Sequence, residues 1–269
     1  MKNTGLFGRV PLIVAAVMFL GGSIAVAAEE IPLPDDVVIL SPAPGLPDDL
    51  AGFIGKWGEG RWSGNLMPVE VVIENIRADG RASVIYAHPD YPDWNTRAGY
   101  LRGRGFMLDG WLITKFRGLT LNLKVPENDT IEGTNAPNIH LRGITLKRQK
   151  YPIWKRLTAA EIRETFTGKT ATIWHEKKEF PLQRYYAPDG TIFTRTPFSE
   201  TPKKGFWFID EQGRLCERAN PMLKKHLWCQ VVADNGEEIA RFFMVTGRKR
   251  IPRPIKTFTY RSFSDGNTL

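Results

Sequence analysis

Four dipeptides typical of tight hairpin turns punctuate the chain, each between short stretches in which apolar and polar residues alternate. They are Asp79-Gly80, Asp109-Gly110, Asp189-Gly190 and Asn235-Gly236. Glycine, asparagine and aspartate accept the positive backbone φ that a two-residue turn requires, so each pair predicts two antiparallel neighbours. The pattern therefore predicts an all-β protein.

Residues 51–148 contain a succession of about eight short segments with strand character. In the segment GLTLNLKV (118–125), the leucines and Val125 face one way, and Thr120, Asn122 and Lys124 face the other. Short, evenly spaced antiparallel strands favour an up-and-down barrel or a strongly curled sheet. An eight-stranded barrel is either filled by its own side chains or holds one small ligand.

A second domain is expected over residues 157–247, after a connector at 149–156 that contains the basic stretch KYPIWKR. It opens with one short helix, in which Thr158 caps the N-terminus, Glu161 completes a capping box and Gly168 ends the helix. Alternating segments then resume, which predicts a second antiparallel sheet. Residues 248–269 are predicted to form a basic, proline-broken tail that is partly mobile.

The first 28 residues have the layout of a cleavable signal peptide. Lys2 and Arg9 precede an apolar run from Pro11 to Leu20, and small residues follow at 25–28. The apolar run is too short to span a bilayer comfortably. We therefore expect a periplasmic or secreted protein with no integral membrane segment after cleavage.

Charge is distributed unevenly along the rest of the chain. Residues 29–50 hold six acidic residues, five prolines and no basic residue, which indicates an acidic, proline-rich leader. Residues 51–269 hold 35 basic and 23 acidic residues, a net charge of +12. Such a surface suits anionic polymers, lipid headgroups or acidic partners, with a merely solvated surface as the alternative. The compartment argues against nucleic acid, and the leader could fold against the basic body and screen it.

The sequence contains two cysteines, Cys216 and Cys229. In an oxidising compartment an even pair usually forms a disulfide. The alternative is a metal site of Cys216, His226 and Cys229, but its spacing matches no standard zinc pattern and no fourth ligand is evident. The disulfide is the favoured interpretation, and no metal or cofactor is expected.

Gly55-Lys56-Trp57 resembles the G-x-W signature of lipocalins and related calycin barrels. In that family the tryptophan closes one barrel end and packs against a basic residue of the last strand, which implies Lys147 or Arg148 here. The resemblance covers about residues 52–148 and implies a barrel. On a regular strand, however, Trp57 and Trp62 point to opposite faces. Unless a bulge intervenes, we expect Trp57 to plug the barrel and Trp62 to pack on the other face or to be exposed.

The second half is similar to a group of secreted proteobacterial domains of unknown function. The shared order is a short helix ending in Gly168-Lys169, then Tyr185-Tyr186, Asp189-Gly190-Thr191, Gly205-x-Trp207 and the two cysteines. This resemblance implies location and fold, and no activity.

The best catalytic candidate is the loop HPDYPDWNTR (88–97), in which His88 and Asp90 could perform acid–base chemistry. Its other side chains, Tyr91, Trp94 and Arg97, are candidate ligand contacts if the barrel mouth is open. The alternative is a structural polar loop, stiffened by its prolines. The chain contains no G-x-S-x-G elbow, dinucleotide fingerprint or H-E-x-x-H pair.

These observations favour a non-catalytic binding protein of the bacterial envelope, whose partner is a small apolar ligand, an envelope polymer or a protein. One alternative is a hydrolase of an envelope polymer or ester that uses His88 and Asp90. Another is a periplasmic inhibitor or assembly factor. The ligand and the oligomeric state do not follow from the sequence.

Overall fold

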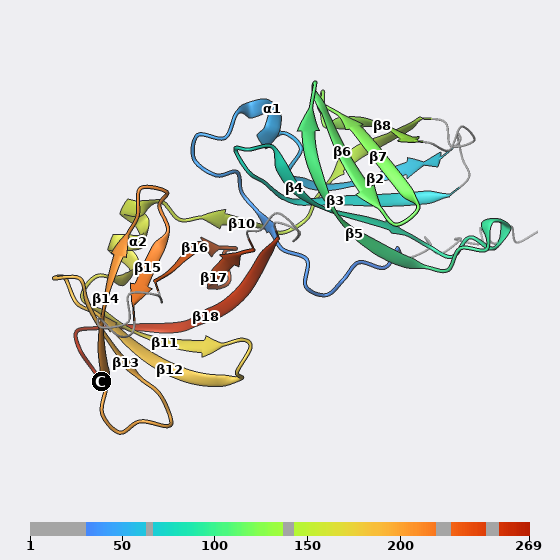
Figure 1. The fold of residues 1–269 in the computed structure, drawn as a ribbon. Helices are drawn as coiled ribbons and strands as arrows, with labels where there is room; N and C mark the ends of the chain where they lie inside the picture. Colours follow the sequence, from blue (N-terminus) through green and yellow to red (C-terminus); the bar gives the residue numbers. More distant parts are fainter. Residues whose placement is uncertain (1–30, 63–66, 137–142, 219–226, 246–252) are drawn as a thin grey trace, which may run out of the picture.

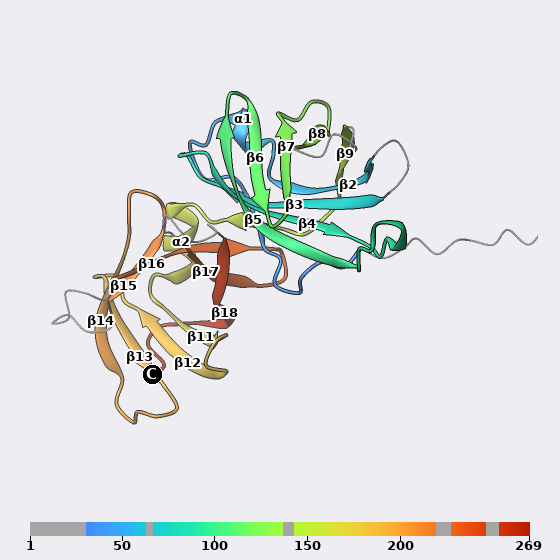
Figure 2. The same ribbon diagram turned by 45° about the vertical axis from the view of Figure 1, so that its right-hand side comes forward.

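The computed structural model describes residues 31–62, 67–136, 143–218, 227–245 and 253–269. It shows an all-β protein with two closed eight-stranded antiparallel barrels and very little helix (Figure 1). The predicted fold class is confirmed. Figure 2, turned by 45°, shows the two barrels as separate bodies side by side. Among the described residues, no helix has the length and apolar character needed to cross a bilayer.

The first barrel is an up-and-down meander in which each strand pairs with the next and the last returns to the first. The short helix α1 (Asp48–Ala51) precedes it, and β2 closes the circle by pairing with β9. Its strands are β2 (Gly55–Arg61), β3 (Pro68–Ile76), β4 (Arg81–His88), β5 (Gly99–Leu108), β6 (Trp111–Phe116), β7 (Leu119–Lys124), β8 (Thr130–Ala136) and β9 (Ile144–Gln149).

A bulge in β2 decides where the two tryptophans of the opening strand lie. The register with β3 shifts between Trp57 and Gly60, and Glu59 adopts a φ of 60°. An extra residue in one strand reverses the alternation of faces beyond it. Trp57 and Trp62 are therefore both fully buried in the same core, so the expectation that Trp62 packs outside or is exposed was wrong.

The second domain is also a closed up-and-down barrel, not an open sheet. Helix α2 (Ala159–Phe166) precedes it, with the Thr158–Glu161 capping box formed at its start. Its strands are β11 (Lys169–His175), β12 (Phe180–Tyr186), β13 (Thr191–Arg195), β14 (Lys203–Ile209), β15 (Leu215–Arg218), β16 (Trp228–Asp234), β17 (Ile239–Met244) and β18 (Pro254–Asp265).

The barrel closes through β18, which pairs with β11 on one side and β17 on the other. This strand lies in the segment predicted as a mobile basic tail, and that prediction was wrong for residues 254–265. Phe258 and Tyr260, two residues apart, enter the core of the second barrel, so the strand is held by burial as well as by pairing.

The acidic leader is part of the fold. Its short strand β1 (Ile39–Leu40) pairs in parallel with β10 (Ile153–Arg156), which in turn pairs with β16 of the second barrel. Ile39 belongs to the core cluster of the first barrel, and Leu40 packs with Trp154 and Phe242 on the outer face of the second. The leader and the connector therefore lie between the barrels and contact both.

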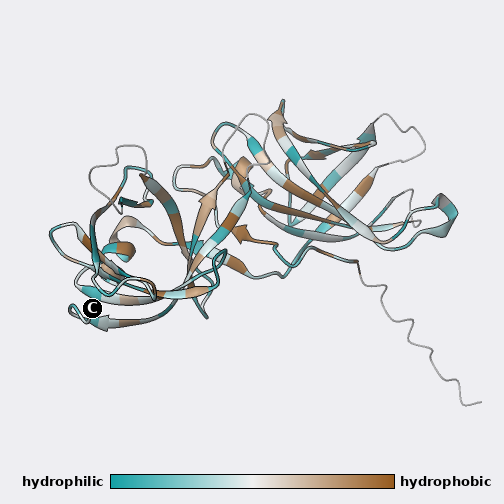
Figure 3. Ribbon diagram, turned by 60° about the horizontal axis from the view of Figure 1, so that its bottom comes forward, coloured by the Kyte–Doolittle hydropathy of each residue, from teal (hydrophilic) through white to brown (hydrophobic). Residues whose placement is uncertain are grey.

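Hydrophobic and hydrophilic residues are interspersed along the strands of both barrels (Figure 3). Two inward-facing positions of β5 are glycines, Gly103 and Gly105. Large side chains of the neighbouring strand already occupy the space into which a side chain at these positions would extend. A methyl group on Gly103 would lie 2.6 Å from Phe116, and one on Gly105 would lie 2.7 Å from Leu112.

This packing predicts that Gly103→Ala destabilises the protein by about 1–3 kcal/mol, because the added methyl forces core side chains to move. Gly99, on the same strand, is the matched control, since a methyl group there meets its nearest atom at 3.8 Å. We expect Gly99→Ala to change stability by less than about 1 kcal/mol. The urea midpoint of unfolding measures both, and equal midpoints would contradict the packing argument.

Candidate functional site

In the loop that is the best catalytic candidate, the described contacts of His88 and Asp90 go to other residues. Nδ1 of His88 lies 3.1 Å from the carbonyl oxygen of Pro89, and its ring packs 5.9 Å from that of Tyr86. Asp90 accepts a hydrogen bond of 2.6 Å from the backbone N–H of Ala98. Within the described contacts, none links the imidazole to this carboxylate.

The remaining loop candidates are spread over the loop. Tyr91 forms an isolated β-bridge with Thr96 and packs against the core of the first barrel, whereas Arg97 is exposed. Trp94 ends the 3-10 turn η2 (Pro92–Trp94), and its side chain lies outside the described part of the structure. Tyr91 and Arg97 therefore lie in different environments, one against the barrel core and the other exposed.

The interior of the first barrel is filled by side chains. Trp62 donates a hydrogen bond of 2.8 Å to the hydroxyl of Tyr86, and burial raises the pKa of that phenol, which stays neutral. Around this pair lie fully buried residues from most strands of the barrel: Trp57, Val71, Leu112, Leu121, Leu123, Ile131 and Leu146. A ligand inside this barrel would have to displace packed core residues, whose loss costs several kcal/mol.

One end of the first barrel is sealed by Trp57 and Arg148. The Arg148 guanidinium lies 4.2 Å above the Trp57 ring and donates to the carbonyl oxygens of Ile54 (2.9 Å) and Gly52 (2.7 Å). Its Nε pairs with Asp129 at 2.6 Å. Arg148 thus ties the last strand to the chain that enters the first.

The core of the second barrel holds a buried ionic network. The carboxylate of Glu217 accepts from Arg241 at 2.5 Å, from Arg184 at 2.7 Å and from the hydroxyl of Tyr186 at 3.0 Å. The Tyr186 and Tyr260 hydroxyls lie 3.1 Å apart. Burial would raise the pKa of Glu217, but the two arginines outweigh it and hold that pKa below its ordinary value. This core therefore carries two guanidinium charges against one carboxylate.

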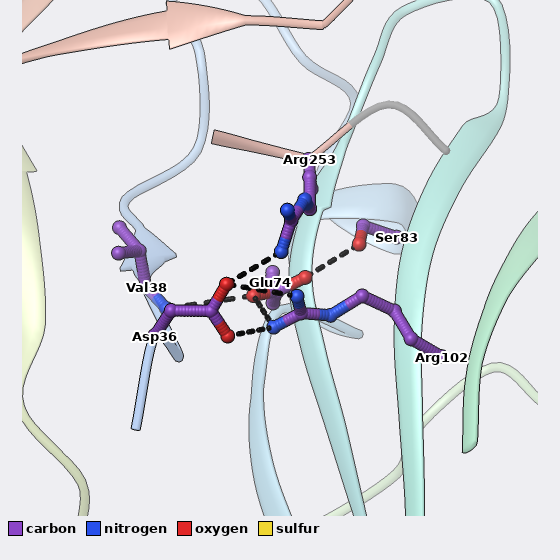
Figure 4. Close-up of polar contacts among 6 residues, drawn as sticks. All are labelled: Asp36, Val38, Glu74, Ser83, Arg102 and Arg253. Atoms are coloured by element: carbon purple, nitrogen blue, oxygen red, sulfur yellow. Dashed lines mark hydrogen bonds and ion pairs between the residues drawn. The ribbon is translucent and has the colours of Figure 1, made fainter. Parts of the chain in front are cut away.

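A second network joins the two barrels through the leader (Figure 4). The carboxylate of Asp36 accepts from Arg102 of β5 at 3.0 and 3.2 Å and from Arg253, just before β18, at 2.6 Å. Arg102 also donates to the fully buried Glu74 at 3.2 Å. Glu74 further accepts from Ser83 at 2.5 Å and from the backbone N–H of Val38 at 3.5 Å.

The two carboxylates of this network have opposite pKa shifts. The hydrogen bond from Arg102 is the main reason that the pKa of Asp36 lies below its ordinary value. Burial is the main reason that the pKa of Glu74 lies above its own. Nearby, burial lowers the pKa of Arg156 to about 10, and its guanidinium donates to the carbonyl oxygen of Ser41 and to Asn75.

A cleft of about 360 Å³ opens beside this network. It is lined by residues 35–38 of the leader, Trp154 of β10 and residues 254–256 of β18. Lys256 lies 5.1 Å from the Trp154 ring and pairs with Glu238. Its volume is at the lower end of the range for small-molecule sites.

The outer wall of the first barrel carries a surface that combines apolar and basic residues. Phe106 and Leu108 are 41% and 51% exposed, and they pair across the β5–β6 ladder with the half-buried Ile113 and Trp111. Directly paired residues of antiparallel strands lie on the same face. Four cations adjoin them on that face, and we call these eight residues the basic-apolar wall: Phe106, Leu108, Trp111, Ile113, Arg81, Arg104, Lys115 and Lys124.

The strand register places the four cations of the wall on its outer face. Arg81 is paired with Phe106, Lys124 with Trp111, and Arg104 with Lys115. Among the described residues, three carboxylates lie nearby: Asp79, which pairs with Arg77 and Arg81, Asp109 in the hairpin turn, and Glu132 of β8, which the β7–β8 register places beside Lys124. Sequence reasoning missed this surface, although the glycines at 103 and 105 could have indicated which face of β5 points inward.

The two cysteines form the predicted disulfide, which links directly paired positions of β15 and β16. Asp210 lies beside them, but sulfurs bonded to each other are not thiolate ligands. His226, the third member of the alternative metal site, lies outside the described residues. Trp207 is buried in the second barrel and donates to the carbonyl oxygen of Ala187 at 3.1 Å.

Comparison with known proteins places the chain in no family. No family of known proteins matches it, and neither a curated protein nor a solved structure does.

The junction network predicts a pH-dependent effect of Asp36→Asn. Because the folded state lowers the pKa of Asp36, its stabilisation is present above the unfolded pKa of about 3.9 and is lost as pH falls through the folded value. We expect Asp36→Asn to lower the melting temperature at pH 7, with the difference closing in acid. Asp35→Asn, at the exposed neighbouring position, is the control and should have little effect.

The buried network predicts a larger effect of Glu217→Gln. The change leaves Arg184 and Arg241 without their charge partner, which costs about 3–5 kcal/mol for a buried pair. Since the pKa of Glu217 is lowered in the fold, the loss should be complete at neutral pH and smaller in strong acid. Urea unfolding at both pH values tests this, with the exposed Glu211→Gln as the control.

Proposed function

We propose that this chain is a non-catalytic binding protein that acts outside the cytoplasm and binds an anionic envelope component. The basic-apolar wall carries this proposal, because it places four cations and four apolar side chains on one outer face. The layout of residues 1–28 and the disulfide support an oxidising compartment.

The filled interior of the first barrel supports binding on an outer surface. The space that a lipocalin-type ligand would occupy holds Trp57, Trp62 and their apolar neighbours. The Trp57–Arg148 stack supports a relation to calycin barrels at the level of fold, and the relation of the second barrel to secreted proteobacterial domains is proposed on its sequence alone. The protein thus uses the barrel as a rigid body that presents its outside.

A small ligand in the junction cleft is the second candidate. Trp154 offers an aromatic face, Val37 and Ile255 supply apolar contacts, and Lys256 supplies a positive charge. The cleft lies between the leader and the second barrel, so a ligand there would contact the segments that hold the two barrels together.

The proposal predicts salt-dependent retention of the purified protein on immobilised dextran sulfate, used as an anionic probe. Lys115→Glu with Lys124→Glu should weaken retention strongly, because two wall cations become repulsive. Binding between exposed charges should fall as salt shortens the screening length. The amount of NaCl needed for elution is the measurement.

The control variant has the same change in net charge at two lysines that lie outside the wall. Lys177→Glu with Lys178→Glu alters two exposed lysines of the second barrel, in the β11–β12 turn. Equal weakening by both double variants would show that net charge alone, and not the wall, accounts for binding.

A further inference from the structure

We infer that the basic-apolar wall is a docking surface for an anionic lipid membrane, with the tip of the β5–β6 hairpin entering the interface. This inference rests on the proposed function and names its ligand class. Binding to a soluble polyanion would account for the four cations of the wall but not for its four apolar side chains. Membrane binding accounts for both.

The shape of the surface fits a membrane. The outer wall of a closed barrel is convex, so Phe106 and Leu108 project from the body and are not recessed in a groove. Asp109 and Gly110 both have positive φ, at 49° and 78°, which makes the tip a tight two-residue turn. The turn holds Leu108 and Trp111 side by side at the end of the hairpin.

The side chains have the chemistry of an interfacial anchor. Tryptophan, phenylalanine and leucine beside lysine and arginine are the residues with which peripheral proteins enter the headgroup region. Lys124 is paired with Trp111, and Arg81 with Phe106, so each ring has a cation beside it. Anionic headgroups attract such cations, while the rings reach the acyl boundary.

An apolar partner protein explains the wall less well. Protein interfaces exclude charge from their apolar centre, with lysine depleted relative to the rest of the surface. Here the lysines directly adjoin the apolar side chains, and two of the four apolar residues are more than two-fifths exposed. A fluid interface accommodates that mixture, since the ammonium groups can extend to the headgroups.

The test is co-sedimentation of the purified protein with phosphatidylcholine vesicles, with and without phosphatidylglycerol. We expect partitioning onto the anionic vesicles only, falling with added NaCl. Phe106→Ser with Leu108→Ser should reduce it by about tenfold or more, because the apolar transfer is lost. Phe208→Ser is the control, since Phe208 is also 41% exposed but lies on the second barrel.

Quenching of tryptophan fluorescence by brominated lipid measures whether Trp111 enters the bilayer interface. Quenching on anionic vesicles should be reduced in Trp111→Phe, and unchanged in Trp228→Phe, an exposed tryptophan of the second barrel. Melting temperatures of all variants show whether they are folded, so a lost signal in a folded variant is attributable to the surface.

The outcomes separate the two proposals. Retention on dextran sulfate without vesicle binding overturns the membrane inference and leaves the proposed function standing. If the protein binds neither dextran sulfate nor anionic vesicles, both the proposed function and the membrane inference are overturned. Equal effects of Phe106→Ser/Leu108→Ser and Phe208→Ser also overturn the inference. So does a change of oligomeric state in the wall variant by size-exclusion chromatography, which would assign the wall to a second copy of the chain.

Discussion

The bifurcated contact of Asp36 with Arg102 and Arg253 joins three parts of the chain that are far apart in sequence. One arginine belongs to the first barrel, the other precedes the closing strand of the second, and the carboxylate belongs to the leader. Beneath this contact, Ile39 and Leu40 enter the apolar clusters of opposite barrels. An acidic leader on a basic chain is therefore placed by charge and fixed by burial.

The same leader explains why the buried Glu74 is tolerated. An isolated carboxylate in such a position would pay a large desolvation cost. Glu74 instead accepts hydrogen bonds from Ser83, Arg102 and the backbone of Val38, and the last of these donors arrives with the leader. Glu217 is likewise a carboxylate buried in the core of the second barrel. Its charge is balanced by two arginines, one from β12 and one from β17. In both places, a buried carboxylate is balanced by donors from other segments of the chain.

Much of this fold follows from local sequence chemistry. The Asp-Gly and Asn-Gly turns mark hairpins, and the cysteine pair marks two strands that lie together. The bulge at Glu59 could not be predicted, because a glutamate at positive φ has no sequence signature. The strand β18 was missed because the basic, proline-containing sequence at 248–254 outweighed the alternation of Phe258 and Tyr260.

The candidate site was harder to predict than the fold, because a surface depends on register. Met107 and Phe106 are both apolar, so hydropathy does not say which of them faces the core, and the glycines at 103 and 105 are the one sequence signal that does. Pairing decides it: Gly103 and Gly105 turn inward against Phe116 and Leu112, and the phenylalanine is left outside. In the loop at 88–97, proximity in sequence is not matched by a described contact between His88 and Asp90, whose hydrogen-bond partners in the described structure are Pro89 and Ala98.

A filled barrel and an apolar outer wall are connected by this same register. Large side chains of β6 leave no room for a side chain at Gly103 and Gly105, so this face of β5 points inward, and Arg104, Phe106 and Leu108 on the alternate face point outward. Phe106 and Leu108 thus cost the protein no core packing, and they place exposed apolar surface at the end of the hairpin. The lysine and arginine side chains beside them supply the positive charge on which the proposed membrane contact depends. The interior packing and the proposed membrane contact are in this sense two consequences of one strand alignment.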